Sequence, residues 1–92
     1  MKNALHILVD LDYAGGGCGV KVCYSDCTKQ YYISFSGEIK DGILLTCPNC
    51  HGDTIEESAR GILEKIKGKL LVFNADDEKR RKEIYFYGGE EQ

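Results

Sequence analysis

Four of the five cysteines in this 92-residue chain lie in two close pairs, and their spacing constrains the fold more than any other feature. The pairs are Cys23-Tyr-Ser-Asp-Cys27 and Cys47-Pro-Asn-Cys50, and nineteen residues separate them. Two thiols on one tight turn can bind a metal ion together, and a tetrahedral zinc site needs two such pairs side by side. The sequence therefore predicts one structural zinc ion per chain, held by Cys23, Cys27, Cys47 and Cys50.

The segment from residue 23 to residue 50 resembles the zinc-ribbon group of small domains. Its first pair departs from the usual ribbon pattern, because three residues separate the cysteines where ribbons mostly have two. The hairpin that would align the two pairs needs its principal turn near Gly37, or bends at both Gly37 and Gly42. Cys18 is the spare thiol in this interpretation, and His51 could replace one of the four cysteines.

The rest of the chain predicts an α+β fold in a single domain, residues 1–92. We expect a small antiparallel β-sheet with a zinc-knuckle hairpin region and one amphipathic α-helix at about residues 54–67, where apolar residues recur at helical spacing. Thr54 with Glu57 has the spacing of a capping box at the start of this helix. Strands are expected at residues 4–13, 20–23, 30–36, 43–46, 70–73 and 83–87.

Two acidic residues, Asp10 and Asp12, fall near the end of the first predicted strand. We expect both carboxylates on the solvent-exposed face, because charged side chains are rarely buried. The glycine-rich run that follows, residues 15–19, is expected to be a flexible turn.

A second interpretation of the cysteines is redox chemistry at Cys47-Pro48-Asn49-Cys50. This motif resembles the active site of thioredoxin-like proteins, and a following helix would lower the pKa of its first thiol. Cys47 would then be the nucleophile and Cys50 the resolving thiol of a thiol-disulfide oxidoreductase. That family also has a later cis-proline, whereas Pro48 is the only proline in this chain.

The charge distribution suggests a third function. The net charge is −3, but the segment from residue 60 to residue 82 carries eight basic and four acidic residues. Its cluster Lys79, Arg80, Arg81 and Lys82 could contact nucleic-acid phosphates in a zinc-containing binding module. Charged residues on a helix or loop surface are more often simply solvated.

We therefore expect a non-catalytic zinc protein with a regulatory or adaptor role. A closed site of four thiolates leaves no coordination position for a substrate water, which favours binding over catalysis. The negative net charge favours a protein partner, reached through exposed tyrosines or the basic loop. No apolar run is long enough for a membrane span or a secretory signal, and with five cysteines a cytoplasmic location is expected.

Overall fold

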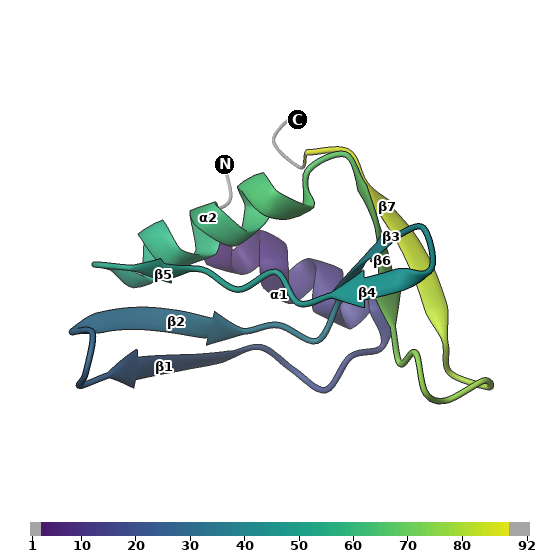
Figure 1. Cartoon of the computed structure of the whole chain (residues 1–92), viewed down its shortest axis with the longest axis horizontal. Helices are drawn as coiled ribbons and strands as arrows, with labels where there is room; N and C mark the ends of the chain where they lie inside the picture. The colour runs from purple at the N-terminus through teal and green to yellow at the C-terminus, as the bar shows by residue number, and fades with distance from the viewer. Residues whose placement is uncertain (1–2, 89–92) are drawn as a thin grey trace.

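The computed structural model describes residues 3–88, which form two helices and two small antiparallel sheets (Figure 1). The predicted α+β fold class is confirmed. Along the chain the elements are α1 (Ala4–Gly15), β1 (Lys21–Ser25), β2 (Gln30–Ser34), β3 (Glu38–Asp41), β4 (Leu44–Thr46), β5 (His51–Gly52), α2 (Ile55–Ile66), β6 (Lys69–Phe73) and β7 (Lys82–Phe86).

The strands are divided between two sheets. Sheet A has the order β1-β2-β5, and sheet B has the order β4-β3-β6-β7. Sheet A and both helices lie on the same side of sheet B (Figure 1), and no helix or strand of residues 3–88 covers its other side. No helix in the described range is long and apolar enough to cross a membrane.

The strand predicted at residues 4–13 is wrong, because this segment forms helix α1. The Asn3 side chain accepts a 2.9 Å hydrogen bond from the His6 backbone N–H and so caps the start of the helix. Gly16 ends it in the left-handed conformation, with φ of 70°. Ala4, Leu8, Asp12 and Gly15 are buried at helical spacing, and this periodicity outweighs the β-branched residues of the segment.

The predicted helix near residues 54–67 is confirmed as α2. The Thr54 hydroxyl accepts a 3.0 Å hydrogen bond from the Glu57 backbone N–H, while the Glu57 carboxylate accepts one from the backbone N–H of Asp53. These bonds satisfy donors that would otherwise be unpaired at the helix start. The capping pattern visible in the sequence therefore fixes this end of the helix.

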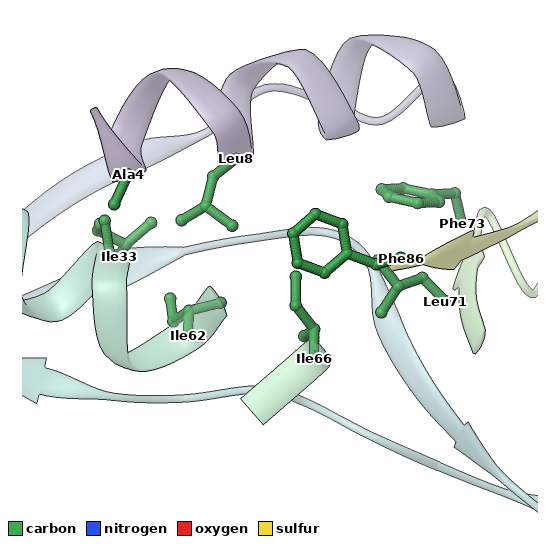
Figure 2. Packing of buried hydrophobic residues seen from close by; sticks show 9 residues of the cluster. Ala4, Leu8, Ile33, Ile62, Ile66, Leu71, Phe73 and Phe86 are labelled. Carbon is green, nitrogen blue, oxygen red and sulfur yellow. The ribbon is translucent and has the colours of Figure 1, made fainter. Parts of the chain in front are cut away.

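The hydrophobic core lies where the helices meet both sheets. Figure 2 shows side chains from α1, α2, β2, β6 and β7 converging in one cluster. Its fully buried members include Leu8, Ile62, Ile66, Leu71 and Phe73. Burying each large apolar side chain contributes about 1.5–3 kcal/mol, so this cluster is the principal source of stability.

The predicted zinc site needs a hairpin with its principal turn at Gly37, so that the two cysteine pairs come side by side. The structure has no such hairpin turn at Gly37. Gly37 lies where the chain passes from β2 in sheet A to β3 in sheet B, while the hairpin turn falls at Gly42, with φ of 72°. A Cβ atom on Gly37 would lie 2.7 Å from Phe73 and 2.8 Å from Phe35. Glycine is needed here because the backbone crosses the core against two aromatic rings.

Asp12 also differs from expectation, because its side chain is buried and only 5% of the residue is exposed. It lies on the inner face of α1 near the joint between the two sheets. The Ser36 hydroxyl and the Gly19 backbone N–H both donate hydrogen bonds to its carboxylate. These partners replace water and make the burial of a charged group tolerable.

Candidate functional site

Three chemically active side chains form a row across sheet A. Cys23 of β1 is paired with Tyr32 of β2, and Tyr32 is paired with His51 of β5. Directly paired residues of neighbouring strands point to the same face of a sheet, so these three side chains share one face. The rings of Tyr32 and His51 lie 5.4 Å apart. This arrangement, which we call the Cys23 row, is on the face of sheet A turned away from the core.

The Cys23 side chain changes the acidity of its neighbour. A hydrogen bond with Cys23 raises the pKa of the Tyr32 phenol, and the negative charge of the thiolate acts in the same direction. The phenol therefore stays protonated beside the thiol and serves as a hydrogen-bonding group within the row.

Cys50 lies on the opposite face of the sheet from the Cys23 row. It immediately precedes His51, and side chains alternate between the two faces along a strand. The Cys50 sulfur packs directly against Gly61 of α2, so that a Cβ atom at Gly61 would collide with it. The Ser58 hydroxyl also donates a 2.8 Å hydrogen bond to the Cys50 carbonyl oxygen. Both contacts hold Cys50 toward α2.

The other cysteines are exposed. Cys27 lies in the turn between β1 and β2, Cys18 precedes β1, and Cys47 follows β4. Within residues 3–88 no group of three or more His, Cys, Asp or Glu side chains is placed to hold a metal ion. As arranged, the four predicted ligands do not form one tetrahedral site, because Cys23 and Cys50 lie on opposite faces of sheet A.

The redox interpretation expects a helix to begin directly after Cys47-Pro48-Asn49-Cys50, and the structure does not have one there. Cys50 leads into strand β5, and α2 begins only at Ile55. Cys47 and Cys50 therefore do not lie at the helix N-terminus, where the helix dipole would stabilise a thiolate.

The basic cluster makes contacts within the chain. Lys82 donates a 3.0 Å hydrogen bond to the Ala14 carbonyl oxygen, and Arg80 donates a 3.5 Å bond to that of Gly16. These carbonyls lie at the C-terminal end of α1, where the helix dipole favours positive charge. Arg81 forms a 3.0 Å ion pair with Glu83. Three of the four cations proposed to contact nucleic acid thus have partners in their own chain.

The outer face of sheet B carries an apolar row that sequence analysis did not define as a surface. Lys40 is paired with both Leu45 and Leu70, and Leu70 is paired with Tyr85, so these four side chains share one face across all four strands. Tyr87 continues the same alternation, and its ring lies 4.7 Å from that of Tyr85. The two tyrosines are 46% and 83% exposed. The sequence signal is the alternation of Ile84 and Phe86 with the two tyrosines.

An open hollow of about 310 Å³ lies beside this region, near the joint between the sheets. It is lined by Ser36, Glu38, Asn74, Ala75, Asp76 and Asp77. Its polar lining consists of three carboxylates, one amide and the hydroxyl of Ser36, which donates its hydrogen bond to the buried carboxylate of Asp12.

Comparison with protein-family models, with curated proteins and with solved structures found no match to this chain.

Proposed function

We propose that this chain is a non-catalytic binding module with a regulatory or adaptor role, and that it binds a protein partner on the outer face of sheet B. The observation that carries the proposal is the exposed Tyr85–Tyr87 pair, with Leu70 directly paired to Tyr85 on the same face. Tyrosine is enriched at protein interfaces because it combines a large apolar ring with a hydrogen-bonding hydroxyl.

The charges on this face favour protein over nucleic acid as the partner. Lys40 forms a 3.4 Å ion pair with Glu83, and Arg81 pairs with the same carboxylate. Glu38 adds a second negative charge to the face. With its cations balanced in this way, the surface has little attraction for a phosphate backbone, which binds chiefly through uncompensated Lys and Arg residues.

Photo-crosslinking would test the proposal directly. A photoreactive phenylalanine derivative replaces Tyr87 in one variant and Tyr13, which is 88% exposed on α1, in a matched control. We expect one protein to be crosslinked from position 87 and not from position 13. Equal crosslinking from both positions would show that exposure alone accounts for the reaction.

The captured protein is then purified and its affinity measured by calorimetry. Replacing both tyrosines with serine, Tyr85→Ser and Tyr87→Ser, is expected to weaken binding at least tenfold, since interface tyrosines are frequent hot spots. Tyr13→Ser is expected to leave affinity unchanged. Unchanged affinity in the double variant, with its fold verified by circular dichroism, would overturn the proposed surface.

The zinc ion predicted for Cys23, Cys27, Cys47 and Cys50 stays a separate prediction. Binding at sheet B does not depend on it, because the Tyr85–Tyr87 pair lies in the other sheet.

A further inference from the structure

We propose that β1 pairs with the β1 strand of a second copy of this chain, antiparallel and centred on Cys23. β1 is an end strand of sheet A, with β2 on one side and no strand among the described residues on the other. In Figure 1 it forms the lower border of the molecule. The unpaired N–H and C=O groups of an edge strand are a template for another strand.

The apolar side chains of β1 fit this pairing. Val22 and Tyr24 share the face that Ile33 and Tyr31 occupy in β2, yet they remain 41% and 50% exposed. A two-fold axis through Cys23 places Val22 of one copy opposite Tyr24 of the other. Such aromatic and β-branched cross-strand pairs are favourable. The Tyr24 ring is already oriented by its edge contact with Tyr31, with ring centroids 5.0 Å apart.

The charges of the strand do not oppose this pairing. Lys21 is the one charged residue of β1, and in the antiparallel register it lies opposite Ser25 of the second copy. No like charges are therefore brought directly opposite each other within the paired strands.

The other edge strands are poorer candidates for pairing with a second copy. β5 has two residues and β4 has three, whereas β1 has five. β7 also has five residues, but two of them, Lys82 and Glu83, are charged, and charged side chains on an edge strand disfavour pairing with another chain. Pairing through β1 joins two copies of sheet A into one six-stranded sheet.

Cys23 gives the proposed pairing a chemical readout. Residues directly opposite in an antiparallel pair have Cα atoms about 4.5–5.5 Å apart. Disulfides form at Cα separations of about 4.4–6.8 Å. Two Cys23 thiols at the axis, pointing to the same face, can thus be joined, with diamide accepting the two electrons and two protons that they lose.

The first experiment measures association by sedimentation equilibrium in a reducing buffer. We expect a reversible dimer, because one edge strand buries less area than a permanent interface. Cys23→Lys places two positive charges face to face at the axis and should raise the dissociation constant at least tenfold. Cys27→Lys, in the exposed turn, is the matched control and should change it little.

The second experiment treats an equal mixture of ¹⁴N- and ¹⁵N-labelled chains with diamide and identifies the linked peptides by mass spectrometry. We expect mixed-isotope Cys23–Cys23 peptides as the main intermolecular product. A chain that stays monomeric at several hundred micromolar would overturn the proposal. A dimer that tolerates Cys23→Lys, or that crosslinks mainly through Cys27 or Cys18, would overturn it as well.

Discussion

The Ser36 hydroxyl donates a 2.5 Å hydrogen bond to the buried carboxylate of Asp12, joining the last turns of α1 to the segment that links sheet A to sheet B. The Gly19 backbone N–H donates a second bond, 2.9 Å long, to the other carboxylate oxygen. One side chain thus holds together the helix, the glycine-rich segment after it and the joint between the sheets.

Asp12→Asn tests the importance of this joint. The new amide can keep both contacts, its oxygen accepting from the Gly19 N–H and its NH₂ group donating to the Ser36 hydroxyl, but the negative charge that strengthens them is lost. We expect the free energy of unfolding in urea to fall by about 1–2 kcal/mol, the difference between hydrogen bonds to charged and to neutral groups. Asp41→Asn, exposed at the end of β3, is the control and should change it by less than about 0.5 kcal/mol. Equal losses in the two variants would contradict this role for Asp12.

Asp12 also shows why the strand predicted at residues 4–13 is wrong. Residues 4–13 alternate in part and contain Ile7 and Val9, which favour a strand. The caps at Asn3 and Gly16 were visible in the sequence and indicate a helix instead. Because the helix periodicity was missed, the burial of Asp12 was missed with it.

The strong local patterns were predicted correctly. α2 has a capping box and a regular apolar stripe, and the β3–β4 turn at Gly42 follows from an Asp-Gly dipeptide. Strand pairing is different, because it depends on contacts distant in the sequence. Nothing local indicates that β2 pairs with β5 while β3 pairs with β6, and this division determines which face each cysteine occupies.

Asn74 is expected to stabilise the C-terminal end of α1. Its backbone has φ of 55°, and its side chain donates a 3.0 Å hydrogen bond to the Gly16 carbonyl oxygen. Asn74→Gly keeps the left-handed conformation and loses the bond, so it should cost about 0.5–1.5 kcal/mol in urea unfolding. Asn74→Ala adds backbone strain and should cost more. A smaller loss for alanine than for glycine would show that backbone conformation does not matter here.

The ion pairs of Glu83 predict a measurable dependence on pH. Its hydrogen bond with Arg81, followed by its contacts with Lys40, lowers the pKa of Glu83 below the ordinary value of 4.5. Because the folded-state pKa is depressed, the stabilisation is complete above 4.5 and is lost as the pH falls through the lowered pKa. In an NMR titration we expect Arg81→Met to raise this pKa toward 4.5, whereas Lys79→Met leaves it unchanged. An unshifted pKa in Arg81→Met would show that the contact is absent in solution.

The contact between Cys50 and Gly61 predicts an unusual double-mutant cycle. Glycine to alanine inside a helix normally stabilises by about 1 kcal/mol, but here the new methyl group would collide with the Cys50 sulfur. Gly61→Ala should therefore destabilise the wild-type chain and stabilise the Cys50→Ala variant, as measured by urea unfolding. If Gly61→Ala stabilises both chains equally, Cys50 does not face α2.

The same contact sharpens the zinc prediction. Cys23 and Cys50 lie on opposite faces of sheet A, so all four thiolates can hold one ion only after one of these two side chains changes its orientation. The prediction requires one zinc ion per chain in native mass spectrometry, lost in Cys50→Ser and retained in the control Cys18→Ser. If Cys50 is the side chain that moves, zinc should also remove the penalty of Gly61→Ala, because the space beside α2 would then be free. A zinc ion that survives Cys50→Ser but is lost in His51→Ala would reject the four-cysteine set. It would assign the ion to the face of sheet A that carries the Cys23 row.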